Sequence, residues 1–182
     1  MSEPGLPDTL SLTKVQLSER KAVIATIRLW SIFSVAVLVN YPWELAQARL
    51  YVGTDGADIA PWLCIVASLV DSALVLLIYA VGVVLFSQRG WFVAPGFSGY
   101  ALMAAAGFLI SISMEWITVY GTRIWAYSPN MPLVPGLGIG VAPLAQMLLL
   151  PPLIFYFVAA WHSRGRSGVT DPSEPCSDAM SR

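Results

Sequence analysis

Four long runs of apolar residues divide the chain, and polar or turn-forming segments separate them. The runs cover residues 22–50, 62–86, 95–119 and 138–161. About 20 apolar residues in helical form are enough to cross the hydrocarbon core of a bilayer. The pattern therefore predicts an all-α fold, an integral membrane four-helix bundle, in which residues 22–161 form the membrane domain.

Prolines lie inside the first and last runs, and we expect them to distort the helices. The first run is apolar from Ala22 to Tyr41 and continues past Pro42, where a kink is expected. In the fourth run the pair Pro151-Pro152 should kink or interrupt the helix. Proline has no backbone N–H to donate, and its ring clashes with the preceding turn.

The segments outside the runs are polar, with one exception. Residues 1–21 form a polar N-terminal segment, and residues 162–182 form a polar tail that we expect to be disordered. The connector at residues 120–137 instead combines three prolines with several aromatic residues. Non-helical backbone at membrane depth must be buried in protein or line a wet cavity. We therefore expect this connector to lie on the membrane or to dip into it.

The distribution of basic residues predicts the orientation. Lysine and arginine concentrate on the cytoplasmic side of membrane proteins. Here they gather in the two polar ends and in the turn between the second and third runs, at Lys14, Arg20, Lys21, Arg28, Arg89, Arg164 and Arg166. The other two connectors hold only Arg49 and Arg123. The sequence thus predicts that both termini are cytoplasmic.

Strongly polar side chains inside the runs gather in the outer halves of the predicted helices. Glu44 and Gln47 close the first run, and a spacing of three puts them on one helical face. Ionisable groups at membrane depth are costly and usually face a bundle interior or a cavity. We therefore predict an outer pocket. Its candidate catalytic acids are Glu44, Asp71 and Glu115, and its candidate substrate-binding residues are Gln47, Arg49, Arg123, Trp125, Tyr127 and Gln146.

The first and third runs end in similar patterns. One reads Trp43-Glu44 and then Arg49-Leu50-Tyr51, and the other reads Glu115-Trp116 and then Arg123-Ile124-Trp125. The distances from Glu to Arg differ, at five and eight residues. A duplicated helical hairpin would produce such an echo and would place a site between its halves.

Composition agrees with a membrane protein and narrows the function classes. The 182 residues are 57% hydrophobic and only 12% charged, and the mean hydropathy is +0.68. A soluble domain would carry about a quarter charged residues. The near-neutral net charge, without a basic block, argues against a nucleic-acid partner. Two cysteines and one histidine offer no metal spacing, so neither a metal nor another cofactor is predicted.

The chemistry that these residues offer is acid–base chemistry. Acidic side chains in apolar surroundings favour the protonated form. Such an acid can deliver a proton to a lipophilic substrate in a dry site. Aromatic side chains nearby can then steady a cationic intermediate. Movement of a solute or proton would need a polar path through the cytoplasmic half, where the runs hold little beyond Arg28.

A structural interpretation of the same residues stays open. Glu44 with Arg49, and Glu115 with Arg123, can form ion pairs that fix helix ends. Asp71 and Gln146 can join helices by hydrogen bonds, and an aromatic belt accounts for most of the Trp and Tyr residues. The protein would then be a non-enzymatic accessory subunit, with a membrane-protein partner or as a homo-oligomer.

Two resemblances bear on these interpretations. The motifs of residues 42–51, 115–132 and 138–146 resemble small uncharacterised bacterial membrane proteins, a resemblance that implies no activity. The Trp43-Glu44 pair and the proline-rich turn are also similar to parts of the membrane carotenoid cyclases and terpene cyclases. The second resemblance implies that Glu44 protonates an isoprenoid, although this chain has fewer predicted spans than the terpene cyclases.

Together these observations lead to one expectation and one alternative. We expect a multi-pass protein of the bacterial inner membrane whose outer pocket binds, and protonates or cyclises, a lipophilic, isoprenoid-like molecule. The alternative is the accessory subunit, in which the buried polar groups are structural. The sequence leaves open whether the protein is an enzyme.

Overall fold

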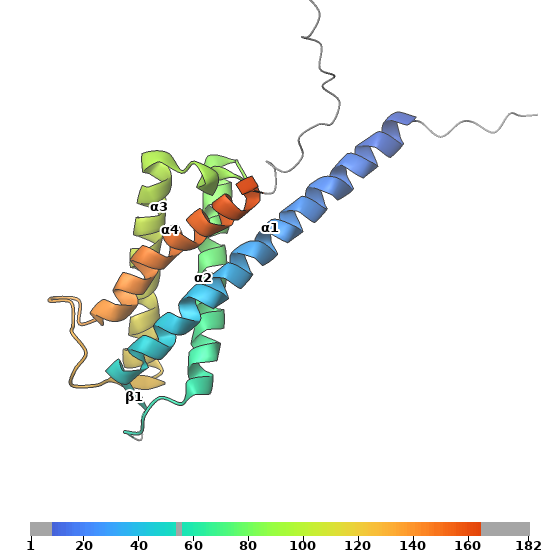
Figure 1. Ribbon diagram of the computed structural model, residues 1–182. Helices are drawn as coiled ribbons and strands as arrows, with labels where there is room; N and C mark the ends of the chain where they lie inside the picture. Colours follow the sequence, from blue (N-terminus) through green and yellow to red (C-terminus); the bar gives the residue numbers. More distant parts are fainter. Residues whose placement is uncertain (1–8, 54–55, 165–182) are drawn as a thin grey trace, which may run out of the picture.

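Four long helices make up most of the described part of the chain (Figure 1). The computed structural model describes residues 9–53 and 56–164. The helices are α1 (Thr9–Gln47), α2 (Pro61–Phe86), α3 (Gly96–Glu115) and α4 (Val141–Arg164). Short elements join them: η1 (Ala48–Leu50), β1 (Tyr51–Gly53), η2 (Trp91–Val93), η3 (Trp116–Gly121) and β2 (Trp125–Tyr127). The all-α prediction is confirmed, whereas the expected disorder of the C-terminal tail concerns residues that lie almost entirely outside the described ones.

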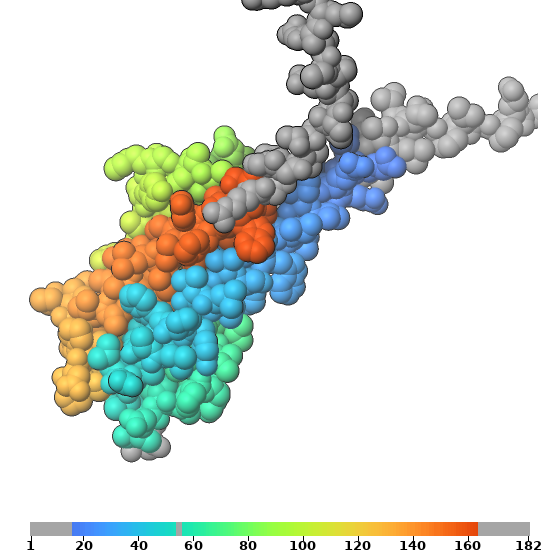
Figure 2. All heavy atoms as spheres, viewed as in Figure 1, coloured from blue at the N-terminus to red at the C-terminus, as the bar shows by residue number. Residues whose placement is uncertain are grey.

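The helices pass back and forth between two ends of the molecule. α1 and α4 lie side by side and cross α2 and α3 (Figure 1). On the face seen in Figure 2, α1 and α4 form one continuous surface, and Figure 1 shows that the start of α1 extends beyond the other helices. α1 packs against α2 and α4, while α3 packs mainly against α4. The connectors that hold β1 and β2 meet at the end opposite to the start of α1.

All four helices are long and apolar enough to cross a membrane. The candidate spans are Gln16–Leu50, Pro61–Phe86, Gly96–Gly121 and Val141–Ser163. Large apolar side chains point outward from each helix, as Val84 (77% exposed) and Phe97 (90% exposed) illustrate. These features indicate a multi-pass membrane protein. α1 has 39 residues, or about 58 Å at 1.5 Å per residue, so it is longer than a bilayer core of about 30 Å requires.

The proline pair in the middle of α4 does not interrupt the helix. The helix is continuous through Pro151 and Pro152, and α1 is likewise continuous through Pro42. Proline at position 151 leaves the carbonyl of Met147 without its usual helical donor. Gly107 of α3 lies against this carbonyl, and a Cβ there would stand 2.1 Å from the oxygen. Close backbone approach, with a Cα–H facing the oxygen, thus holds α3 against α4 at the proline pair.

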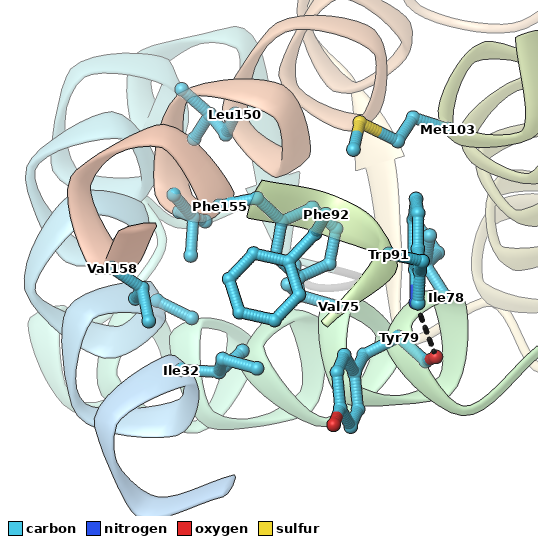
Figure 3. Close-up of a cluster of buried hydrophobic side chains, with 12 residues drawn as sticks. Ile32, Val75, Ile78, Tyr79, Trp91, Phe92, Met103, Leu150, Phe155 and Val158 are labelled. Carbon is cyan, nitrogen blue, oxygen red and sulfur yellow. Dashed lines mark hydrogen bonds between the residues drawn. The ribbon is translucent and has the colours of Figure 1, made fainter. Parts of the chain in front are cut away.

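Aromatic side chains fill one end of the bundle, which we call the aromatic end (Figure 3). Trp91 and Phe92 of η2 pack against Phe155 of α4, with ring centroids 5.5 and 5.4 Å away. The Trp91 indole N–H donates to the carbonyl of Tyr79 at 3.2 Å. Gly82 of α2 makes room for this indole, since a Cβ there would lie 2.1 Å from Trp91 Cε2. This end is therefore closely packed.

Folded connectors cover the opposite end, which we call the cavity end. β1 and β2 pair antiparallel, with Tyr51 opposite Tyr127. The proline-rich connector then folds back on itself, because Val134 N–H donates to the carbonyl of Ile139 at 2.8 Å. The Tyr120 hydroxyl donates to the carbonyl of Gly138 at 2.6 Å. The connector thus presents a fixed structure to the helices that it joins.

Candidate functional site

A cavity of about 390 Å³ lies at the cavity end and is lined by all four helices. Most of its wall is apolar. The lining residues Val66, Val70 and Ile124 are also exposed on the surface, so the cavity opens beside them. Val66 and Val70 lie within the candidate span of α2. The opening therefore lies at a level of the bundle where the outer surface is apolar.

The amide of Gln146, on α4, joins acidic side chains from two other helices. Its Nε2 lies 2.8 Å from Glu44 Oε1, 2.8 Å from Asp71 Oδ2 and 3.0 Å from Asn40 Oδ1. Gln47 Nε2 adds donations to Glu44 Oε1 at 2.8 Å and to Gln146 Oε1 at 2.9 Å. The carboxyl groups of Glu44 and Asp71 are thus close neighbours around one amide nitrogen.

Counting hydrogens shows how this network can be completed. The Gln146 amide has two N–H groups, yet three acceptors lie within 3.0 Å of its nitrogen. Gln47 uses its own two N–H groups on Glu44 and Gln146. The arrangement therefore leaves room for one proton shared between the carboxyl groups of Glu44 and Asp71.

The third acid, Glu115, is held by two phenols. Tyr51 donates to its Oε1 at 3.1 Å, and Tyr127 donates to its Oε2. Burial, and then the nearby Glu115 carboxyl, raise the pKa of Tyr51 and of Tyr127, which lie in strands between the spans. Both phenols therefore stay protonated and act as donors. The backbone N–H of Gly140 donates in turn to the Tyr127 hydroxyl at 3.0 Å.

Two unusual helix ends bring these groups together. α1 tightens into the 3-10 helix η1 before β1, whereas α3 widens into the π-helix η3 before β2. π-helical turns occur frequently at functional sites. β1 and β2 then pair, so the phenols of Tyr51 and Tyr127 come side by side above Glu115. The two segments with similar sequence patterns thus meet at one site.

The structure places most of the predicted site residues on this cavity. Six of them line it, namely Glu44, Gln47, Asp71, Glu115, Trp125 and Gln146. Tyr127 reaches the site through its hydrogen bond to Glu115. Arg49 and Arg123 are exposed and lie outside the described lining. The structural interpretation expected ion pairs of Glu44 and Glu115 with these arginines. Instead, amide groups donate hydrogen bonds to Glu44, and phenol groups donate to Glu115.

Sequence reasoning did not place Asn40, Tyr51 and Ser111 in the site. Asn40 is 1% exposed and contacts the Gln146 amide. Ser111 is 2% exposed and lines the cavity. A helical spacing of four was the available signal, because Asn40 precedes Glu44, and Ser111 precedes Glu115, by one turn. Tyr51 follows the helix, so no periodic signal marked it.

Known proteins add no assignment to this site. Comparisons with protein-family models, with curated proteins and with solved structures found no match to the chain. Within the described residues, no group of three or more His, Cys, Asp or Glu side chains is arranged to hold a metal ion. The chemistry of the cavity therefore has to be inferred from its own acids, amides and phenols.

Proposed function

We propose that this membrane protein binds a lipophilic, isoprenoid-like molecule in the cavity and donates a proton to it. The observation that carries the proposal is the pair of adjacent carboxyl groups, Glu44 and Asp71, on an otherwise apolar cavity wall. A proton-initiated cyclisation or isomerisation is the reaction class that such a pair would support.

The shape of the cavity supports a lipophilic ligand. Its volume of about 390 Å³ falls in the range of about 300–1,000 Å³ that is typical of small-molecule sites. The opening beside Val66 and Val70 lies inside a candidate span and is bordered by apolar side chains. A molecule dissolved in the lipid would enter by this route without crossing water.

The polar wall supports a proton donor. A proton held between the carboxyl groups of Glu44 and Asp71 can pass to a carbon–carbon double bond in the cavity, and the pair keeps the resulting negative charge. Gln47 and Gln146 donate to these groups and would stabilise that charge. The rings of Tyr51 and Trp125, whose centroids lie 5.9 Å apart, can stabilise a carbocation.

Deuterium transfer tests this function directly. The full-length protein is purified in D₂O, and the lipids that co-purify are extracted and analysed by mass spectrometry. Wild-type protein should place deuterium on carbon in a bound lipid, and Glu44→Gln and Asp71→Asn should slow this at least about 100-fold. Both variants should keep their thermal unfolding temperature, because the amides that replace the acids still accept hydrogen bonds. Wild type without any deuterated lipid would argue against proton transfer.

The accessory subunit is a second candidate, and one observation favours it. The Gln146 amide ties α1, α2 and α4 together through Asn40, Glu44 and Asp71, which is also what helix-joining polar groups do. In that case Asp71→Asn and Glu44→Gln should change folding or assembly without changing any lipid. Size-exclusion chromatography of the same samples separates the two candidates.

We also infer that both termini face the cytoplasm of a bacterial inner membrane. The supporting observation is a basic group at the aromatic end, where Arg28 donates to the carbonyl of Arg89 at 2.7 Å and lies near Lys21. Basic residues favour the cytoplasmic side. A C-terminal green fluorescent protein fusion should fluoresce, and a C-terminal alkaline phosphatase fusion should be inactive. The reverse result would invert the orientation.

A further inference from the structure

Ser111 presents a buried hydroxyl whose hydrogen bond is unmade. Helical serines usually donate to the carbonyl one turn earlier, as Ser113 does at 2.8 Å and Ser68 at 2.7 Å. Ser111 lies in the same helix as Ser113, yet its Oγ has no partner among the described residues. The side chain is 2% exposed and lines the cavity. Buried polar groups nearly always have partners, so this hydroxyl calls for one inside the cavity.

The indole of Trp125 is a second buried donor without a partner. Trp43 donates to Gln47 Oε1 at 3.1 Å, and Trp91 donates to the carbonyl of Tyr79 at 3.2 Å. Trp125 Nε1 is buried, and no acceptor meets it in the described part of the chain. β-Pairing with Gly53 and edge contact with Tyr51 hold the residue in place. An indole N–H can only donate, so its missing partner is an acceptor atom.

The charge of the cavity limits what that acceptor can be. Glu44, Asp71 and Glu115 all line the space, and none of the described lining residues is basic. A phosphate or carboxylate would meet acids there without a counter-charge, which is costly in apolar surroundings. A hydrocarbon without a polar atom would leave both donors unsatisfied. A neutral oxygen accepts hydrogen bonds from the donors and brings no negative charge close to the three acids.

We infer that the molecule bound in this cavity carries a neutral oxygen, a hydroxyl or carbonyl, which is held by Trp125 Nε1 and the Ser111 hydroxyl. This inference rests on the proposed function, because it concerns the same cavity and its lipophilic ligand. It narrows that ligand to an alcohol, aldehyde, ketone or quinone with an apolar tail. Isoprenoid diphosphates and plain hydrocarbons are excluded.

Three probes with one shared tail test the assignment: farnesol, farnesene and farnesyl diphosphate. Their dissociation constants are measured on the full-length protein in detergent by microscale thermophoresis. Farnesol should bind at least about tenfold more tightly than either of the other two. Trp125→Phe and Ser111→Ala should each weaken farnesol binding about 3- to 10-fold and leave farnesene binding unchanged.

Matched variants isolate the two hydrogen bonds. Ser113→Ala removes an exposed serine of the same helix whose hydroxyl is already paired, and Trp116→Phe removes an exposed indole. Both should bind farnesol as wild type does. Equal losses for farnesol and farnesene in Trp125→Phe would show that the ring only packs, and this would overturn the inference.

The outcomes also separate this inference from the proposed function. Tightest binding of farnesyl diphosphate, or equal binding of farnesol and farnesene, would refute the neutral oxygen and leave the lipid cavity standing. Failure of all three probes to bind wild-type protein would refute the lipophilic ligand itself, and the inference with it. Weak farnesol binding that Trp125→Phe and Ser111→Ala leave unchanged would mean that both donors are met by water.

Discussion

At the aromatic end Trp91 fills the space beside α2, whereas at the cavity end Trp125 borders a space of about 390 Å³. The Trp91 indole donates to Tyr79, while the Trp125 indole has no partner in the described part of the chain. Both tryptophans follow a helix closely in sequence and lie in a short element between two spans. The two ends therefore place the same residue type in different surroundings, one indole paired and packed and the other unpaired beside a cavity.

This difference indicates that the aromatic end stabilises the fold and that the cavity end has space for a ligand. Close packing and completed hydrogen bonds contribute stability. Unfilled volume and unmade hydrogen bonds cost stability, and natural proteins retain such costs mainly at functional sites. The aromatic end can thus hold the helices together, and the cavity end is free to keep three acids around an open space.

The largest effect is expected from adding a single methyl group at the aromatic end. In Gly82→Ala the new Cβ would fall 2.1 Å from Trp91 Cε2, so the indole must leave its place among Phe86, Phe92 and Phe155. We expect a loss of about 3 kcal/mol, measured by thermal unfolding in detergent. Gly90→Ala is the control, because nothing lies within 4 Å of a Cβ there. Equal stability of the two variants would contradict the packed aromatic end.

A larger addition at the cavity end should be tolerated. Ala67 lines the cavity, so the extra carbons of Ala67→Leu enter empty space and should change stability by less than about 1 kcal/mol. The same substitution should abolish binding of the farnesol probe. A loss of stability as great as that of Gly82→Ala would show that the space is not available.

The second-largest effect is expected at Gln146. Gln146→Leu removes the amide that contacts Asn40, Glu44 and Asp71, and it brings their oxygens against a hydrocarbon side chain. Lost hydrogen bonds between membrane helices average about 0.6 kcal/mol each, so we expect a loss of about 2 kcal/mol. Gln88→Leu, at an exposed position in the turn after α2, should be neutral. If both variants have the same unfolding temperature as wild type, the hydrogen bonds of Gln146 do not stabilise the fold.

Hydropathy alone was sufficient to predict the four helices, because each run is continuous and long. It could not show that α1 begins at Thr9, since polar residues extend a helix without changing the apolar pattern. The continuity of α4 through Pro151-Pro152 was also not predictable, because it involves a contact with another helix. The freed carbonyl of Met147 is met by Gly107, which lies far away in sequence.

The positions of the acids in the apolar runs were enough to predict that they face the interior. Their hydrogen-bond partners depend on contacts between segments that are distant in sequence. Glu44, Asp71 and Glu115 were predictable because ionisable side chains at that depth seek an interior. The phenol donors of Glu115 arise from the pairing of β1 with β2, two strands of three residues each. Strands that short carry no periodic signal. Arg49 and Arg123 have long side chains, so their positions in sequence did not reveal that both are exposed.

A smaller effect is expected from Tyr51 at high pH. Burial raises the pKa of Tyr51 above its ordinary value of 10.0, so the unfolded phenol ionises first. Its contribution to stability is complete below about pH 10 and declines as the pH rises further, by at most about 1.4 kcal/mol per pH unit. Unfolding temperatures between pH 8 and pH 11 should therefore fall less steeply in Tyr51→Phe than in wild type. Tyr156→Phe, at an exposed position on α4, should keep the wild-type slope.

The smallest effect compares the two indoles themselves. Trp91→Phe loses the hydrogen bond to Tyr79 and leaves space in the aromatic cluster, so it should cost at least about 1 kcal/mol. Trp125→Phe loses an N–H that the described residues leave unpaired, so it should cost nothing or slightly stabilise the protein without ligand. Thermal unfolding of both variants in lipid-free detergent measures the difference. Equal costs would mean that Trp125 is a packing residue like Trp91, whereas a neutral Trp125→Phe that binds farnesol poorly would show an indole N–H kept for a ligand.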